Sequence, residues 1–201
     1  MTLKVIKAEN VNKANHTSQP PKVIGLAGWS GAGKTTLLCK LIPELTRRGH
    51  RVSTIKHAHH RFDVDTPGKD SYEHRAAGAT EVLVTSANRW ALMHENRGAP
   101  EPSLWDLLPK LAAVDLVIVE GFKQEGHEKL EVFRRANQKP LLATGDPKVV
   151  AVLSTEPVPE TQRPVLDLND IPAIADFVIA HCHLTERRQA GCVDSVRGAA
   201  Q

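Results

Sequence analysis

The chain has 201 residues, enough for one domain with a substantial core, and a formal net charge of +3. This small, dispersed charge does not indicate a nucleic-acid-binding protein, and neither a membrane-spanning run nor the apolar core of a signal peptide is present. Three cysteines far apart in the chain, Cys39, Cys182 and Cys192, argue against a disulfide framework and predict a reducing, cytoplasmic setting.

The two ends of the chain differ in composition from the middle. The stretch KAENVNKANHTSQPPK is polar and contains prolines, so residues 1–21 are expected to form a flexible leader. Residues 185–201, TERRQAGCVDSVRGAAQ, are expected to form a disordered tail. A single folded domain is therefore predicted between residues 22 and 184.

The first element of this domain is a strand followed by a glycine-rich turn and a helix. Residues 23–27 form an apolar run, and leucines at helical spacing follow from Leu37 to Leu45, with Gly49 as the predicted stop. Between them lies a match to G-x-x-x-x-G-K-[ST], the P-loop, whose backbone N–H groups surround phosphate. We expect Lys34 to reach the β- and γ-phosphates and Thr35 to bind Mg²⁺. The matching residues are Gly28, Trp29, Ser30, Gly31, Ala32, Gly33, Lys34 and Thr35.

A second strand, predicted at 52–57, leads into the stretch TIKHAHHRFDVDTPGKDSYEHRAAGA. Lys56 and His57 end this strand and are expected at the ligand crevice. Asp63 and Asp65 share one face if their segment is extended, so a carboxylate there could join the Mg²⁺ shell. His57 with its neighbours His59 and His60 suggests a metal, but the spacing of a closed zinc site is missing. Anion binding or surface imidazoles remain the alternatives.

Further along the chain, strand-like and helix-like runs alternate. This alternation predicts an α/β fold of the P-loop NTPase type, with a mostly parallel sheet flanked by helices and an antiparallel hairpin extension. The hairpin strands carry apolar side chains on both faces, and an isolated two-stranded ribbon of this kind is marginal in water. Burial against a second copy is one solution, and folding over its own sheet is the other. The predicted strands are 81–86, 89–95, 116–120, 130–133 and 149–153, and the predicted helices are 71–77, 104–113 and 171–181.

The stretch DLVIVEGFK holds the acidic residue expected beside the P-loop. Glu120 ends a fully apolar strand, so it is expected at the carboxyl edge of the sheet, where ligands bind. Asp115 precedes the strand and is expected at the opposite edge. In P-loop proteins an acid at this position holds Mg²⁺ directly or through water. Glu120 and Lys34 are therefore the predicted catalytic residues.

Several stretches together resemble one known family. GWSGAGKTTLLCKLIP, IKHAHHRFDVDTPGKDSYEHRAAGA, RWALM, DLVIVEGFK and DLNDIPAIADFV resemble, in this order, the molybdopterin-guanine dinucleotide biosynthesis adaptor proteins, the MobB family of P-loop GTP-binding proteins. The resemblance spans about residues 22–180. It implies GTP and Mg²⁺ as cofactors. It also implies phosphate binding by Gly28 to Thr36, a range that adds Thr36 to the residues of the motif. It also implies Mg²⁺ coordination by Thr35, Asp65 and Glu120.

The resemblance further implies a role in molybdenum cofactor maturation, beside the guanylyltransferase that joins GMP to molybdopterin. It implies weak GTP hydrolysis, a homodimer with strands of both subunits in shared sheets, and contact with molybdopterin or the molybdenum cofactor. The guanine-reading motif Asn-Lys-x-Asp is missing, so guanine preference rests on the resemblance, with residues 154–156 as the expected base-side loop. Trp29 excludes a trans-acting lysine at its position. The alternatives are a small-molecule kinase, although no arginine-rich lid is evident, and a metallochaperone GTPase.

Overall fold

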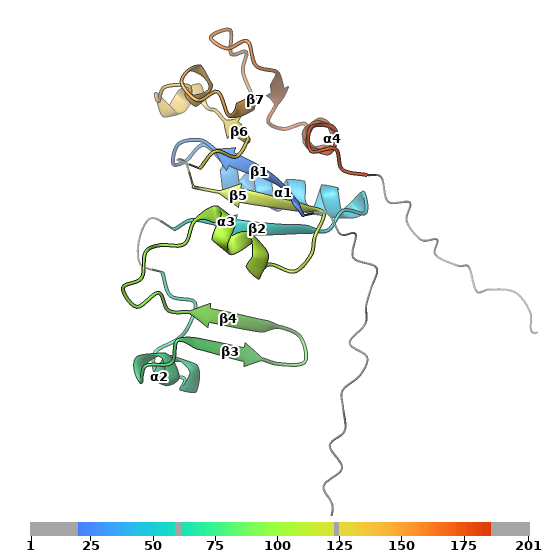
Figure 1. The fold of residues 1–201 in the computed structure, drawn as a ribbon. Helices are drawn as coiled ribbons and strands as arrows, with labels where there is room; N and C mark the ends of the chain where they lie inside the picture. The colour runs from blue at the N-terminus through green and yellow to red at the C-terminus, as the bar shows by residue number, and fades with distance from the viewer. Residues whose placement is uncertain (1–19, 59–61, 123–124, 186–201) are drawn as a thin grey trace, which may run out of the picture. The chain divides into compact units, whose positions relative to one another are not determined.

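A computed structural model describes residues 20–58, 62–122 and 125–185. The chain forms two compact units, the first made of residues up to Ile55 together with those from Ala112, and the second of Lys56–Leu111 (Figure 1). The predicted leader and tail lie almost wholly outside the described residues, so their boundaries stay predictions.

The first unit combines six strands with two α-helices. Its strands are β1 (Lys22–Ala27), β2 (Val52–Lys56, ending at the start of the second unit), β5 (Leu116–Glu120), β6 (Lys129–Val132), β7 (Val149–Ser154) and β8 (Val165–Asp167). Its helices are α1 (Lys34–Arg47) and α4 (Ile171–His181), with 3₁₀ turns η2 (Arg135–Asn137) and η3 (Leu142–Thr144). The second unit contains α2 (Asp70–Ala76), β3 (Glu81–Thr85), β4 (Trp90–His94), α3 (Leu104–Leu107) and the 3₁₀ turn η1 (Leu108–Lys110).

The six strands of the first unit form one sheet in the order β2-β5-β1-β6-β7-β8 (Figure 1). β1 pairs in parallel with both β5 and β6, with Leu26 opposite Glu120 on one side and Leu130 on the other. β6 with β7, and β7 with β8, are also parallel. The carboxyl ends of these strands therefore meet at one edge of the sheet, which confirms the predicted parallel α/β fold. The loop that follows β1 lies at this edge.

Helices α1 and α4 pack together on the apolar core of the sheet. The apolar stripe of α1, from Leu37 to Leu45, is buried because its four leucines recur at helical spacing. Ile174 and Val178 of α4 join them, and Cys182 packs at the end of α4. Burial raises the pKa of the Cys182 thiol to about 11. These contacts hold the N-terminus of α1 in a fixed place at the carboxyl edge of the sheet.

Strand β6 carries charged side chains that are nevertheless buried. Lys129 and Glu131 alternate with Leu130 and Val132, and Glu131 is 0% exposed. The Glu131 carboxylate accepts hydrogen bonds of 2.8 Å from the backbone N–H groups of Leu142 and Ala143, at the start of η3. Burial raises the pKa of Glu131, while these two N–H donors act in the opposite direction. The carboxylate thereby fixes the loop between β6 and β7 onto the sheet.

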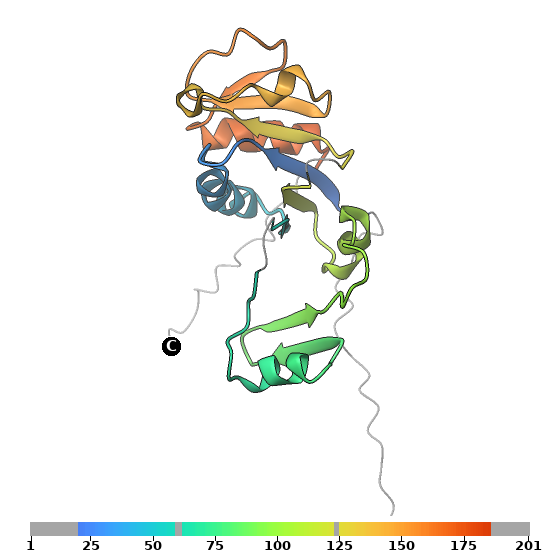
Figure 2. The same cartoon turned by 90° about the vertical axis from the view of Figure 1, so that its left-hand side faces the viewer.

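The second unit is built around the β3–β4 hairpin. The strands are antiparallel (Figure 2). Their register places Leu83 opposite Leu92 and Thr85 opposite Trp90. The Ser86 N–H donates to the Arg89 carbonyl, which closes the predicted two-residue connection. In α2, all of whose residues are described, no side chain is buried. Polar contacts hold it instead, since Arg75 of α2 bonds to Glu95 just after β4.

One predicted helix is shorter than expected, and one strand was missed. The pattern at 104–113 predicted a single helix, but α3 ends at Leu107 and continues only as η1, because Pro109 lacks the N–H that an α-helical turn requires. A capping box between Ser103 and Asp106 starts α3. β8 is a three-residue edge strand, too short to give a periodic signal. Among the described residues, no helix is both long and apolar enough to cross a membrane.

Candidate functional site: a P-loop at the carboxyl edge of the sheet

The loop between β1 and α1 has the backbone that its glycines predict. Gly28, Gly31 and Gly33 all have positive φ, of 136°, 78° and 104°. Two features exclude a side chain at Gly28. Its φ is positive, and a Cβ atom there would lie 2.5 Å from the carbonyl oxygen of Val132. Ala32 is buried beneath the loop. The end of β6 therefore lies directly against the start of the loop.

The N-terminus of α1 has no side-chain cap and begins with a lysine. Gly33 occupies the N-cap position, where it offers no side chain, and the first turn of the helix contains no acid, so no carboxylate of that turn competes with an anion for the first N–H groups. Lys34 Nζ lies 2.9 Å from the carbonyl oxygen of Gly28 and 3.1 Å from that of Trp29. A helix N-terminus and the ammonium of Lys34 thus belong to the same glycine-rich loop, a combination that favours an anion. Thr35 and Thr36 lie exposed in the same turn.

The acids at the two ends of β5, Asp115 just before the strand and Glu120 as its last residue, lie at opposite edges of the sheet, as predicted. Glu120 is the last residue of β5 and pairs in register with Leu26, two residues before the loop begins. Asp115 lies beside the start of β1, where its carbonyl accepts from Lys22 N–H. Its carboxylate accepts a 2.8 Å hydrogen bond from Arg51 N–H and thereby stabilises the turn before β2. Glu120 is therefore the acid that lies at the same edge of the sheet as the loop, and Mg²⁺ binding by it stays a prediction.

This difference gives a paired prediction. Glu120→Gln should lower Mg²⁺-dependent hydrolysis roughly 10–100-fold, the usual cost of losing a supporting ligand of a metal. Asp115→Asn should leave hydrolysis within about two-fold, because the amide oxygen still accepts from Arg51 N–H. Steady-state phosphate release measures both, and circular dichroism checks that both variants fold. A large loss with Asp115→Asn and none with Glu120→Gln would contradict the assignment.

The loop is braced by the segment that follows β6. The Trp29 indole N–H donates a 2.8 Å hydrogen bond to the Pro140 carbonyl, and Lys139 Nζ lies 5.7 Å from the Trp29 ring centroid. Trp29, predicted only as a phosphate-loop residue, therefore also fixes the loop to a distant part of the chain. Ser154, at the end of β7 in the predicted base-side loop, accepts from the Glu156 N–H and forms a tight turn.

Arg134 is a residue of the site that sequence reasoning missed. It follows β6, and its Nε donates a 2.9 Å hydrogen bond to the Ala32 carbonyl within the loop. The signal in the sequence was two adjacent arginines, Arg134 and Arg135, shortly after a strand. That this strand, β6, lies beside the P-loop strand β1 could not be known from the sequence.

Comparison with known proteins agrees with this geometry. A family model described as molybdopterin guanine dinucleotide synthesis protein B (MobB) matches residues 23–155. The chain belongs to the MobB family. This confirms the resemblance seen in the sequence, and the matched range includes the P-loop, the hairpin and Glu120.

Two relatives and a solved structure illustrate the similarity. The chain is 47% identical over 160 residues to the molybdopterin-guanine dinucleotide biosynthesis adapter protein of Escherichia coli (strain K12), with 78% of this chain and 91% of the relative covered. It is 46% identical over 159 residues to the protein of the same name from Haemophilus influenzae, with 78% and 86% covered. The crystal structure of a MobB protein homolog from Bacillus stearothermophilus has a TM-score of 0.60 and 27% identity, covering 81% of this chain and 98% of that one.

The other predicted site residues of this MobB-family chain lie at the start of the second unit. His57 Nε2 lies 2.7 Å from the Glu101 carboxylate. The Asp65 carboxylate accepts from the Ser71 hydroxyl at 2.9 Å and lies 3.4 Å from Arg75 Nε. Binding by Lys56 and His57, and Mg²⁺ coordination by Asp65, stay predictions.

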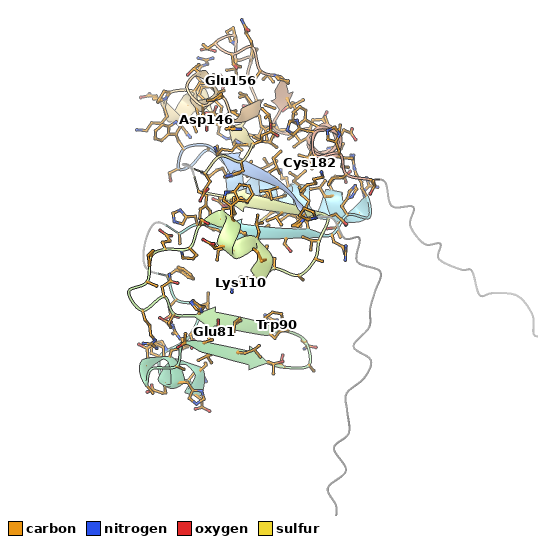
Figure 3. All side chains as sticks on the ribbon, viewed as in Figure 1. Glu81, Trp90, Lys110, Asp146, Glu156 and Cys182 are labelled. Atoms are coloured by element: carbon orange, nitrogen blue, oxygen red, sulfur yellow. The ribbon has the colours of Figure 1, made fainter. Side chains whose placement is uncertain are left out.

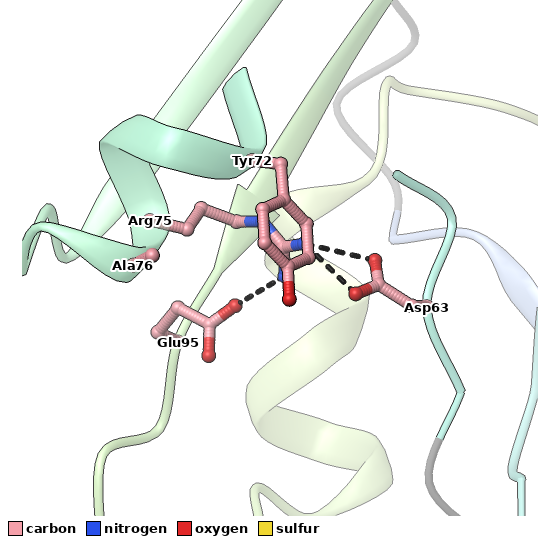
Figure 4. Close-up of a pocket in the computed structure, with 5 residues that line it drawn as sticks. All are labelled: Asp63, Tyr72, Arg75, Ala76 and Glu95. Carbon is pink, nitrogen blue, oxygen red and sulfur yellow. Dashed lines mark hydrogen bonds and ion pairs between the residues drawn. The ribbon is translucent and has the colours of Figure 1, made fainter. Parts of the chain in front are cut away.

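A small pocket in the second unit is formed around Arg75 (Figure 4). Asp63, Tyr72, Arg75, Ala76 and Glu95 line this cavity of about 180 Å³. The guanidinium binds Asp63 through both carboxylate oxygens, at 2.9 and 3.0 Å, and Glu95 at 2.8 Å, and it lies 5.3 Å from the Tyr72 ring centroid. Hydrogen bonds from Arg75 hold the pKa of Asp63 below its usual value, and the two carboxylates raise the pKa of Arg75. The ion pairs of Arg75 that line this pocket hold α2 to the hairpin.

The histidine metal site is a prediction that falls partly outside the described residues. His59 and His60 lie outside them, as does Cys192. Among the residues that the structure describes, no group of three His, Cys, Asp or Glu side chains could hold a metal ion. His181 instead bonds to Glu128 at the end of α4, where a helix end was predicted, and neighbouring Cys182 faces the core.

Proposed function

We propose that this chain is a GTP-binding adaptor of molybdopterin guanine dinucleotide biosynthesis, with weak GTPase activity, that assists the molybdenum cofactor guanylyltransferase. The observation that carries this is the uncapped N-terminus of α1 with Lys34 beside it, at the sheet edge where Glu120 also ends its strand. That arrangement supports binding of a nucleoside triphosphate with Mg²⁺. Membership of the MobB family supports the adaptor role and the choice of guanine.

The proposal assigns roles to the residues of the loop. Backbone N–H groups from Gly28 to Thr36 surround the phosphates, and Lys34 neutralises their charge. Mg²⁺ would be held by the Thr35 hydroxyl and by Glu120, directly or through water, with Asp65 as a further ligand. The metal would neutralise the phosphate oxygens, while the chain supplies position and charge.

The proposal also includes a homodimer formed through the β3–β4 hairpin. Seven of the eight exposed large hydrophobic side chains among the described residues belong to the second unit. On one face of the hairpin, Leu83, Trp90 and Leu92 are 57%, 64% and 46% exposed. Trp90 is labelled in Figure 3. A second copy of the hairpin is the occupant that the family resemblance implies, and an apolar face needs an apolar partner.

The experiment that tests the adaptor role is a pull-down from molybdenum-replete cells. Immobilised wild-type protein with Mg²⁺ and GTP is expected to retain the guanylyltransferase, identified by mass spectrometry. Lys34→Ala, run in parallel, measures how far retention depends on nucleotide. Absence of the guanylyltransferase from the wild-type sample would contradict the adaptor role. Stoichiometric transfer of phosphate to a small acceptor would identify a kinase instead.

A further inference from the structure

Arg134 lies directly against the P-loop. Parallel pairing of β1 with β6 brings the end of β6 to the loop, where the Val132 carbonyl approaches Gly28. Two residues later, Arg134 Nε bonds to the Ala32 carbonyl at 2.9 Å. A Cβ atom placed on Gly33 would lie 3.6 Å from both Nε and Nη2 of Arg134. The guanidinium therefore covers the bare backbone of the residue that precedes Lys34.

Arg134 carries a charge that the described part of the chain does not balance with a nearby carboxylate. No carboxylate among the described residues forms an ion pair with it, whereas the adjacent Arg135 binds Glu160 at 2.8 Å. The bond to Ala32 uses one of five N–H donors, and the residue is exposed, so the others remain for a ligand. A guanidinium matches phosphate oxygens through paired, charge-assisted hydrogen bonds.

We infer that Arg134 binds the phosphate chain of the nucleotide directly, as a second cation supplied in cis beside Lys34. This inference rests on the proposed nucleotide binding and adds a residue to it. The competing role is that of a brace, in which Arg134 only holds the Ala32 carbonyl and thereby shapes the loop. A direct contact depends on the ligand's phosphates, whereas a brace also affects the protein without ligand.

The test compares Arg134→Gln, Arg134→Lys and the neighbouring control Arg135→Gln. Calorimetry measures the affinity of each variant for GTP and for inorganic tripolyphosphate, both with Mg²⁺. Arg134→Gln is expected to weaken both ligands about ten-fold or more, since a charge-assisted hydrogen bond is lost. Arg134→Lys should be intermediate, because it keeps the charge without the fork. Arg135→Gln should match wild type. The melting temperature of Arg134→Gln without ligand should stay within about 2 °C of wild type.

Three results would overturn the inference while leaving nucleotide binding intact. Unchanged affinities for Arg134→Gln would exclude any contact. Weaker GTP binding with unchanged tripolyphosphate binding would place Arg134 at the base. Weaker binding of both ligands with a clearly lower melting temperature would identify a brace. Failure of wild type to bind GTP, by contrast, would overturn the proposed function itself.

Discussion

Lys34→Ala should lower the affinity for Mg²⁺–GTP at least ten-fold, which corresponds to roughly 1.4 kcal/mol or more. The Lys34 ammonium lies within 3.1 Å of the loop carbonyls of Gly28 and Trp29, so it is already positioned over the loop. Losing a charge-assisted contact to phosphate costs about 1.5–3 kcal/mol. Isothermal titration calorimetry measures the change directly, and hydrolysis should fall in parallel.

Lys40→Ala is the matched control for this variant. Lys40 is an exposed lysine of the same helix, within α1 rather than at its N-terminus, so its loss removes equal charge from a place without phosphate. Its affinity for Mg²⁺–GTP should remain within about two-fold of wild type, because exposed charges are largely screened. Equal affinities for wild type and Lys34→Ala would defeat the assignment of the P-loop as the nucleotide site.

The second large effect concerns association. Wild-type protein should scatter light as a particle of twice the 22.0 kDa chain mass at micromolar concentration, and Leu83→Asp with Trp90→Ala should scatter as a monomer. Both residues lie on the same exposed face of the hairpin, since the pairing places Leu83 opposite Leu92 and Trp90 opposite Thr85. Burying a charge in an apolar interface without a partner is strongly unfavourable.

Trp105→Ala is the control for the double variant. Trp105 is also an exposed tryptophan, 53% accessible, but it lies on α3 and not on the hairpin. It should leave the dimer intact, which separates a general loss of apolar surface from loss of this face. A wild type that remains monomeric at micromolar concentration contradicts the dimer. A double variant that is a well-folded dimer contradicts the hairpin as its contact.

The sequence predicted the elements whose signals are local. The P-loop motif, the apolar strand before it and the leucine stripe of α1 all lie within about 25 residues, and all are found as predicted. Glu120 was placed correctly because a residue at the end of a buried parallel strand must lie at the ligand edge. The hairpin was predicted from alternating apolar residues on either side of a short connection.

Features that depend on contacts between distant segments were missed. Arg134 meets Ala32 only because β6 pairs with β1, and nothing in the local pattern shows which strands are neighbours. Burial of Glu131 likewise depends on the loop at Leu142 folding back over the sheet. The helix beginning at Leu104 was predicted too long, because the apolar spacing continues past Pro109, and it is Pro109 that interrupts the α-helix.

The Arg75 network makes the hairpin unusually responsive to the solution around it. The Asp63 carboxylate of this network is 44% exposed, so its pairing with Arg75 is open to screening as salt rises, because the Debye length falls to about 3 Å at 1 M. The lowered pKa of Asp63 gives a stabilisation that is present at neutral pH and is lost as the pH falls below about 4, through that lowered value. The apolar face responds in the opposite direction, since sulfate strengthens apolar association. Ammonium sulfate would therefore weaken the ion pairs of Arg75 while strengthening the proposed dimer, so the choice of salt decides which effect an experiment reports.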